Sequence, residues 1–265
     1  MTAVEVQLTR VGYTSQRAWF ADRSSFFRAI RFPAMVAIIR HPRLGTILFD
    51  TGYGTALYDA PSARLYLHLL PFALPEAERV AARVADVDMV FLSHFHPDHI
   101  GGLREVPGCP PILHSRRGLA KLRSLTGLDR RRSAFFEELL PTDFAARAQA
   151  LEDLPETSCD GWGPGRDVAG DGSLIAVPLP GHATGQYGLM CRLNGGKRLF
   201  LCADAAWVRA NIVSKATRPA WPVRILVDDY AAFHETLDHL QAFAQAHPGV
   251  RIVPSHCEDS IGPLD

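Results

Sequence analysis

The sequence has no net charge, few cysteines and no long hydrophobic run. Lysine and arginine together number 28, as do aspartate and glutamate, so the formal charge is zero. Such a chain has no broad electrostatic attraction for phosphate backbones or anionic lipids. No apolar run approaches the roughly 18 residues that a membrane-spanning helix needs. Nucleic-acid and membrane partners are therefore disfavoured, and a small molecule is the expected binding partner.

Disulfide and export signals are also missing. Cysteine occurs five times, an odd number, and never in a C-x-x-C pair, so neither a disulfide framework nor a thiolate zinc site is predicted. Residues 1–10 alternate polar and apolar side chains and lack the basic segment and apolar core of a secretion signal. We therefore expect a cytoplasmic protein with free thiols.

The composition is otherwise that of an ordinary globular protein. Hydrophobic residues make up 47% and charged residues 21% of the 265 residues, which argues against disorder and fibrous repeats. A chain of this length can bury roughly three quarters of its unfolded surface. We expect a single domain over residues 1–265, present as a monomer or a homodimer.

Alternating or continuous apolar runs predict strands in both halves of the chain. In the first half, a meander of three strands and a later buried strand are predicted, with a helix before the buried strand: 4–11, 35–40, 46–49 and 89–92, and 75–84. The second half has four predicted strands and a helix that Asp228 or Asp229 could cap: 174–179, 186–193, 198–202 and 250–254, and 230–246. This succession favours an α+β fold, a four-layer αββα sandwich.

A different pattern separates the two halves. Residues 115–153 have a mainly helical pattern, and a glycine-rich, proline-containing loop is predicted over 160–172. We interpret 115–172 as a helical and loop insertion within the domain. The basic run Arg130 to Arg132 lies here, and in a chain of balanced charge it is interpreted as a solvated helix start.

The most informative segment is SHFHPDHIGG, residues 93–102, directly after the predicted buried strand. It brings four potential metal ligands into six residues: His94, His96, Asp98 and His99. Imidazole nitrogens and carboxylate oxygens suit zinc and related divalent ions. A loop that leaves a strand end can point alternate side chains at one ion and the next pair at a second. The spacing therefore favours a cluster of two metals.

This segment resembles the H-x-H-x-D-H signature of the metallo-β-lactamase superfamily, which it matches at every ligand position. Three later segments resemble further motifs of that family in order and spacing: Pro180 to Gly185 (PGHATG), Cys202 to Asp204 and Pro254 to His256. The resemblance covers nearly the whole chain and implies the αββα fold.

The resemblance also implies roles for individual residues. It places His94, His96 and His182 on a first metal, Asp98, His99 and His256 on a second, and Asp204 between the two. The segment FDTG, residues 49–52, resembles an early family motif in which Asp50 would accept a hydrogen bond from a liganding imidazole and fix its tautomer.

Such a centre implies hydrolysis. Two divalent ions roughly 3.5–4 Å apart can share a bridging water and lower its pKa towards about 7. The resulting hydroxide would attack a carbonyl carbon, and Asp98 would act as the catalytic residue that passes the proton to the leaving group. The expected cofactors are two divalent ions, with zinc as the expected metal, although the donor set also accepts manganese, iron or cobalt.

Departures from particular relatives narrow the expected substrate. Secreted β-lactamases of one subclass use a cysteine ligand where this chain has Asp204, so antibiotic hydrolysis is disfavoured. Flavodiiron relatives typically have glutamate at the position of His96, which disfavours a redox di-iron site. RNA-processing relatives usually add a nucleic-acid-binding arm, and no basic stripe is present here.

The motifs are closest to those of N-acyl homoserine lactonases, enzymes that quench quorum sensing by opening an acyl lactone. Those enzymes commonly place tyrosine three residues after the bridging aspartate, where this chain has Trp207. An indole can donate a hydrogen bond but cannot act as a phenol. Candidate walls of a pocket for a small acyl substrate are Trp207, Phe26, Phe27, Leu67, Leu70 and Phe136.

Two alternatives stay open. A thioesterase of glyoxalase II type would use the same metals on a thioester, although those enzymes usually append a helical substrate domain. A protein that binds metal and an acyl signal without turnover would keep the same ligands. Hydrolysis of lactones beside matched thioesters separates these classes.

Overall fold

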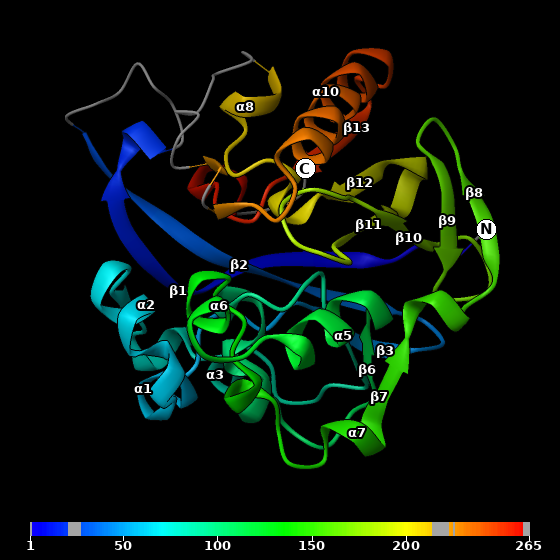
Figure 1. Ribbon diagram of the computed structural model, residues 1–265. Helices are drawn as coiled ribbons and strands as arrows, with labels where there is room; N and C mark the ends of the chain where they lie inside the picture. The colour runs from blue at the N-terminus through cyan, green and yellow to red at the C-terminus, as the bar shows by residue number, and fades with distance from the viewer. Residues whose placement is uncertain (1, 21–27, 214–222, 225, 262–265) are drawn as a thin grey trace.

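Two β-sheets lie face to face in the computed structural model, which describes residues 2–20, 28–213, 223–224 and 226–261 (Figure 1). The first sheet has seven strands in the order β4-β1-β2-β3-β5-β6-β7. Their bounds are β1 Glu5–Arg17, β2 Ala29–His41, β3 Gly45–Phe49, β4 Phe72–Ala73, β5 Met89–Phe91, β6 Ile112–His114 and β7 Ala148–Ala150. β1, β2 and β3 pair antiparallel as the predicted meander, whereas β3, β5, β6 and β7 are parallel.

The second sheet has six strands in the order β13-β12-β11-β10-β9-β8. Their bounds are β8 Glu156–Cys159, β9 Gly163–Asp167, β10 Leu174–Pro178, β11 Tyr187–Arg192, β12 Arg198–Leu201 and β13 Val250–Val253. Neighbours pair antiparallel except β12 and β13, which are parallel.

Helices cover the outer faces of both sheets. Those on the side of the first sheet are short: α1 Ala56–Asp59, α2 Arg64–Leu69, α3 Val80–Arg83, α4 Pro97–Ile100, α5 Arg116–Ser124, α6 Gly127–Arg132 and α7 Phe144–Arg147. On the other side lie α8 Ala210–Val213 and α10 Tyr230–Ala246. No helix among the described ranges is long and apolar enough to cross a bilayer. The architecture is the predicted αββα sandwich.

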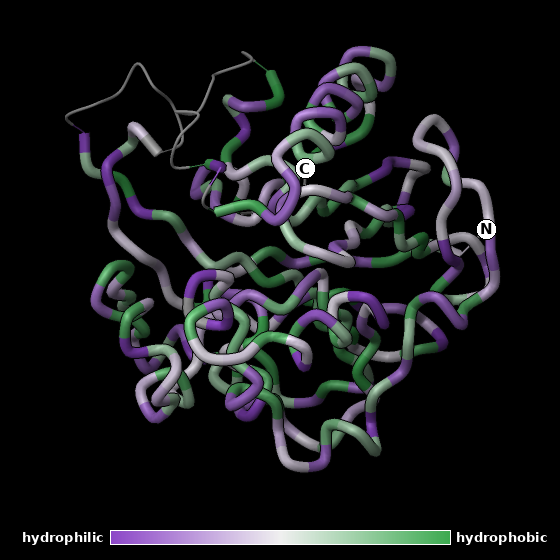
Figure 2. Tube along the Cα trace, viewed as in Figure 1, coloured by the Kyte–Doolittle hydropathy of each residue, from purple (hydrophilic) through white to green (hydrophobic). Residues whose placement is uncertain are grey.

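Three buried clusters correspond to the three spaces between the four layers. The sequence of β2 is continuously apolar because both faces of this strand are covered. Val36 and Ile38 face the cluster under the helices, whereas Ala37 and Ile39 face the cluster between the sheets. The third cluster packs α10 on the second sheet, and hydrophobic and hydrophilic residues alternate along the turns of this helix in Figure 2. The apolar pattern of each element therefore predicts which of its faces is buried in the core.

The helix predicted over 75–84 is confirmed only in part. The segment forms a 3-10 helix, Glu76–Glu78, and the single turn α3, and Arg79 between them has an extended backbone with φ −60° and ψ 145°. Glu78 accepts a hydrogen bond from Nε of Arg10 on β1 at 2.9 Å, and Nε of Arg79 donates to Glu105 at 2.9 Å. Glu78 and Arg79 are neighbours in the chain but pair with different distant residues. These two ion pairs outweigh the local preference for a continuous helix.

The loop predicted over 160–172 is also wrong in part, because β9 lies within it and pairs with both β8 and β10. A Cβ added at Gly165 would lie 2.7 Å from Cγ2 of Ile175 and 2.8 Å from the carbonyl oxygen of Ala176. Here glycine permits close approach of two strands instead of marking a loop. Helices α5 and α6 agree with the helical pattern of 115–153, and the description of 115–172 as an insertion in a single domain stays a prediction.

Candidate metal centre

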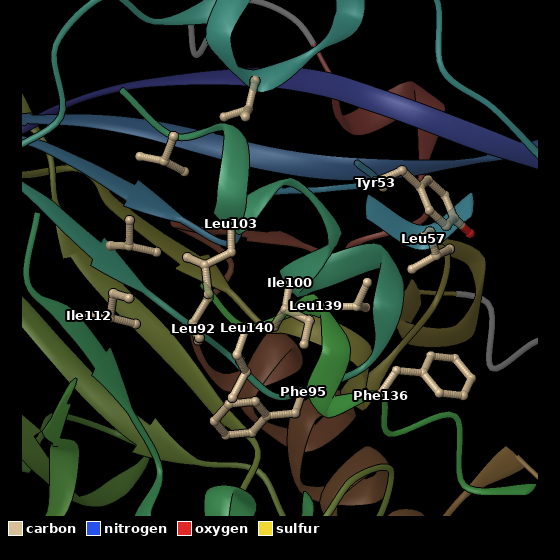
Figure 3. Packing of buried hydrophobic residues seen from close by; sticks show 14 of the residues in the cluster. Tyr53, Leu57, Leu92, Phe95, Ile100, Leu103, Ile112, Phe136, Leu139 and Leu140 are labelled. Atoms are coloured by element: carbon tan, nitrogen blue, oxygen red, sulfur yellow. The ribbon is translucent and has the colours of Figure 1, made fainter. Parts of the chain in front are cut away.

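The candidate ligands follow the ends of four strands that meet at one edge of the sandwich: His94 to His99 after β5, His182 after β10, Asp204 after β12 and His256 after β13. In the segment after β5, ligand side chains alternate with a buried apolar one. Nε2 of His94 and Nδ1 of His96 lie 3.1 Å apart, whereas Phe95 between them is buried in the cluster under the helices (Figure 3). The residue before a proline favours an extended backbone, and His96 has φ −73° and ψ 156° before Pro97 begins α4.

The first group consists of three histidines. Nδ1 of His96 lies 3.1 Å from Nε2 of His94 and 3.0 Å from Nε2 of His182. Two nitrogens bound to one tetrahedral zinc at about 2.0–2.1 Å would be about 3.3 Å apart. The three lone pairs therefore converge at a spacing that suits one divalent ion, and this donor set fits the metal that the sequence pattern implies.

The second group consists of Asp98, His99 and His256. Oδ2 of Asp98 lies 3.5 Å from Nε2 of His256 and 3.7 Å from Nε2 of His99. Each residue offers one ligand atom, and the three atoms lie within 4.8 Å of one another. The side chain of Asp98 is 15% exposed, compared with 11% for His256 and 2% for His99, so Asp98 and His256 form the more exposed side of this group.

Asp204 contacts both groups. Its Oδ2 lies 3.2 Å from Nε2 of His182 and 3.1 Å from Nε2 of His256, and its Oδ1 lies 3.4 Å from Nε2 of His99. The backbone that presents it is strained, because Ala203 has φ 46°, a conformation uncommon for residues other than glycine. Asp204 is thus placed where a carboxylate could bind two ions at once.

Three of the imidazoles are oriented by acceptors that contact Nδ1, the ring nitrogen on the far side from the ligand atom. Nδ1 of His99 lies 2.8 Å from Oδ2 of Asp50, which is the contact expected of the FDTG segment. Nδ1 of His256 lies 2.8 Å from the carbonyl oxygen of Pro33 on β2, and Nδ1 of His94 lies 3.0 Å from Oγ of Ser93. A hydrogen on Nδ1 leaves the Nε2 lone pair for a metal. Sequence reasoning missed Ser93 and Pro33, because neither residue type signals this role.

Burial makes the first group suitable for a metal. Burial and the neighbouring imidazoles hold the pKa of His94 well below its ordinary value. Burial likewise lowers the pKa of His96, despite the nearby carboxylates. Both rings are therefore neutral near pH 7, and a metal ligand must be a neutral imidazole.

The second group has a different charge balance. Burial alone would lower the pKa of His99, but the surrounding carboxylates raise it well above its ordinary value. Burial would raise the pKa of Asp204, but the imidazoles around it bring it well below its ordinary range. Nε2 of His99 and Oδ1 of Asp204 are buried without a hydrogen-bond partner in the described part of the chain. A cation between them would satisfy both atoms.

An anchor that sequence reasoning missed holds the loop of His182. Oδ2 of Asp228 accepts hydrogen bonds from N and Oγ1 of Thr184, each at 2.7 Å. Its Oδ1 lies 2.9 Å from Nζ of Lys121 on α5. Asp229, next in the chain, caps α10 by accepting a hydrogen bond from the backbone N–H of Ala232. The acidic pair that predicted a helix start thus also fixes a ligand loop.

The predicted pocket residues have different surroundings. Trp207 is 8% exposed, and its ring centroid lies 6.4 Å from those of His182 and His256. Leu67 and Leu70, in and just after α2, are partly buried. Phe136 is fully buried in the core cluster and contacts Tyr66 edge to face. Phe26 and Phe27 lie outside the described residues.

Sequence comparison identifies the family of this chain. The family model of the metallo-beta-lactamase superfamily matches residues 30–256. N-acyl homoserine lactonase AttM of Rhizobium radiobacter is 27% identical over 189 residues, which cover 66% of this chain and 60% of that protein. Probable metallo-hydrolase Rv2300c of Mycobacterium tuberculosis is 28% identical over 183 residues, covering 63% and 55%. The match thus spans about 60% or less of the length of these curated relatives.

Solved structures share the fold at low identity. A mutant of AiiA of B. thuringiensis, with N-decanoyl-L-homoserine bound at the active site, superposes with a TM-score of 0.72 at 15% identity, covering 98% of this chain and 95% of that chain. AidC, a dizinc quorum-quenching lactonase in complex with a product, gives 0.64 at 16% identity, covering 97% and 89%. With the family model matched over most of its length, the chain belongs to the metallo-beta-lactamase superfamily.

Proposed function

We propose that this chain is a hydrolase with two divalent metal ions, zinc as the expected metal, that opens the ester bond of N-acyl homoserine lactones. The observation that carries the proposal is the joining of two ligand groups by one carboxylate. Oδ2 of Asp204 lies 3.2 Å from His182 in one group and 3.1 Å from His256 in the other. Such a shared ligand is what a two-ion hydrolytic centre requires.

Seven side chains would hold the ions. The first group supplies His94, His96 and His182, the second supplies Asp98, His99 and His256, and Asp204 serves both. Two divalent cations bound there would polarise a carbonyl oxygen and make hydroxide available near neutral pH.

Asp98 is the residue that we assign to proton transfer. Its carboxylate is 15% exposed, so it is accessible to a substrate that approaches from solvent. With Oδ2 facing His99 and His256, the other carboxylate oxygen, Oδ1, can take the proton that the attacking water loses and donate it to the leaving alkoxide oxygen when the ring opens. The reaction adds one water across the ester bond and needs no other reactant.

The choice of a lactone rests on the relatives. Curated relatives are named as N-acyl homoserine lactonases, and several structural neighbours carry acyl-homoserine products. The apolar side chains of Leu67 and Leu70 are partly buried, and they offer surface to an acyl chain. Trp207, whose ring centroid lies 6.4 Å from that of His182, would contribute to the shape of the substrate pocket.

Hydrolysis of matched substrates tests the proposal. Protein with its metal content assayed is given butanoyl to dodecanoyl homoserine lactones beside thioesters with the same acyl chains, and product release is followed. Lactone opening is expected to dominate, with two ions bound per chain. A preference for thioesters would instead support a thioesterase of glyoxalase II type. Two bound ions without turnover of any substrate would support an acyl-signal binder.

A further inference from the structure

Ser93 lies between the two ligand groups. It follows β5, and its side chain is fully buried. Its Oγ lies 2.8 Å from Oδ2 of Asp50, 3.0 Å from Nδ1 of His94 and 3.3 Å from Nδ1 of His99. Its backbone N–H donates to Oδ1 of Asp50 at 2.8 Å. Ser93 and Asp50 are both fully buried and are joined by two hydrogen bonds.

The chemistry of these groups sets the direction of each hydrogen bond. An ionised carboxylate only accepts, so the Ser93 hydroxyl donates its single proton to Asp50. Oγ can then only accept from His94, which places the hydrogen of that imidazole on Nδ1. The Nε2 lone pair of His94 is left facing Nδ1 of His96, 3.1 Å away. This is the tautomer that a metal ligand of the first group needs.

The same carboxylate acts on the second group without an intermediary. Nδ1 of His99 lies 2.8 Å from Oδ2 of Asp50 and donates to it directly. The rings of His94 and His99 lie close together, with centroids 4.0 Å apart and planes tilted by 47°. Nδ1 of His94 bonds to Ser93 instead, so the serine hydroxyl is the connection of His94 to that carboxylate.

We propose that Ser93 is a positioning residue that extends the control of Asp50 from the second ligand group to the first, and so sets the metal affinity of the three-histidine group selectively. The inference rests on the proposed two-ion centre. Asp50 then orients one imidazole of each group, directly at His99 and through Ser93 at His94. Loss of the serine hydroxyl affects one ion, whereas loss of the carboxylate affects both.

Metal titration of the metal-free protein tests this without any substrate. Zinc is added in competition with a chromophoric chelator, which yields two binding constants for the wild type. Ser93→Ala is expected to weaken one constant by about 10–100-fold, the usual effect of removing a partner of a liganding histidine. The other constant is expected to stay unchanged. Asp50→Asn, which exchanges an acceptor oxygen for a donor, is expected to weaken both.

Ligand variants identify which constant belongs to which group. His182→Ala removes a ligand of the first group, and His256→Ala removes one of the second. The constant weakened in Ser93→Ala is expected to be the one lost in His182→Ala. Nitrogen NMR of the imidazoles gives a second readout, because Ser93→Ala is expected to shift His94 from the Nδ1–H towards the Nε2–H tautomer.

Two controls separate the hydroxyl from the cavity that alanine leaves. Ser93→Thr keeps the hydroxyl and Ser93→Val has the same shape as threonine without it, so threonine is expected to retain both constants and valine to lose one. Comparing threonine with valine still tests the role of the hydroxyl if the alanine variant folds poorly. Ser255→Ala is the matched control, since Ser255 is also fully buried beside a candidate ligand, but its Oγ has no hydrogen-bond partner within the described ranges.

The outcomes are distinct. Wild-type constants in both Ser93→Ala and Ser93→Val, or equal weakening of both constants, would overturn the role of Ser93. A wild-type protein that binds no zinc would overturn this role together with the proposed function. A protein that binds two ions and opens no lactone would contradict only the proposed function, because metal binding by the serine variants is measured independently of turnover.

Discussion

Asp204 and His256 lie 3.1 Å apart, from carboxylate Oδ2 to imidazole Nε2, although 52 positions separate them in the chain. They follow β12 and β13, which are parallel neighbours with Leu201 opposite Val253. Each residue therefore stands three positions beyond a paired strand residue. The register of one strand pair thus delivers two ligands to the same point, and the predictions below concern what such a centre does and what holds it.

Metal binding is expected to stabilise the fold. Several buried ligand atoms face one another, including Nε2 of His99 and Oδ1 of Asp204 at 3.4 Å. An ion that binds only the folded chain adds about 2.7 kcal/mol when its concentration is about 100 times its dissociation constant. The midpoint of thermal unfolding should rise with added zinc and fall with a chelator. A midpoint independent of both would contradict the two-ion centre.

Asp98→Asn should lower turnover of the preferred lactone by about 10²–10⁴-fold, the usual range for loss of a general acid or base. The amide keeps the size of the side chain but cannot exchange a proton. Because Asp98 is also a candidate ligand, metal content must be measured on the same samples. Undiminished turnover with both ions retained would remove Asp98 from the proton-transfer step.

Gly181→Ala should destabilise the protein by clearly more than the roughly 1 kcal/mol expected from backbone strain alone. Gly181 has φ 119°, and a Cβ there would lie 2.1 Å from the backbone nitrogen of Phe233 in α10. Urea unfolding measures the change. Gly195→Ala is the control, because its φ is 72° and nothing lies within 4 Å of the added atom. Equal losses in both variants would mean that α10 and the His182 loop can separate freely.

Glu105 should make stability depend on pH in the acid range. Burial would raise its pKa, but hydrogen bonds from Thr55 and the ion pair with Arg79 lower it below the ordinary value. A depressed folded pKa gives stability that is complete above the unfolded pKa and is lost as the pH falls through the folded one. The free energy of unfolding should therefore decrease as the pH is lowered below about 4.5, the ordinary pKa of this glutamate.

Glu105→Gln isolates this contribution. At pH 7 the variant should lose about 2 kcal/mol, because hydrogen bonds to a charged acceptor become hydrogen bonds to a neutral one. Its unfolding free energy should then decline less steeply than that of the wild type on acidification. Parallel pH profiles for the two proteins would show that Glu105 does not titrate differently in the folded and unfolded states.

Local sequence patterns predicted the elements that depend on neighbouring residues in the chain and the strands that are apolar on both faces. The helix Tyr230–Ala246 and its aspartate cap follow from helical spacing, and the continuous apolar runs of β2 and β5 indicate strands covered on both sides. The broken helix at Arg79 and the strand β9 could not be predicted in this way. Both depend on partners far away in the chain, Glu105 for the first and the neighbouring strands for the second.

The sequence by itself determined which ligand atoms are available and in what order, because imidazoles and carboxylates at the spacing of residues 94–99 suit few other uses. Tertiary structure alone decided that loops after separate strands meet within hydrogen-bonding distance. It also decided that Asp50, from the end of β3, reaches His99 directly and His94 through Ser93. The physical reason is that parallel strands end at a common edge, where their registers bring distant side chains together.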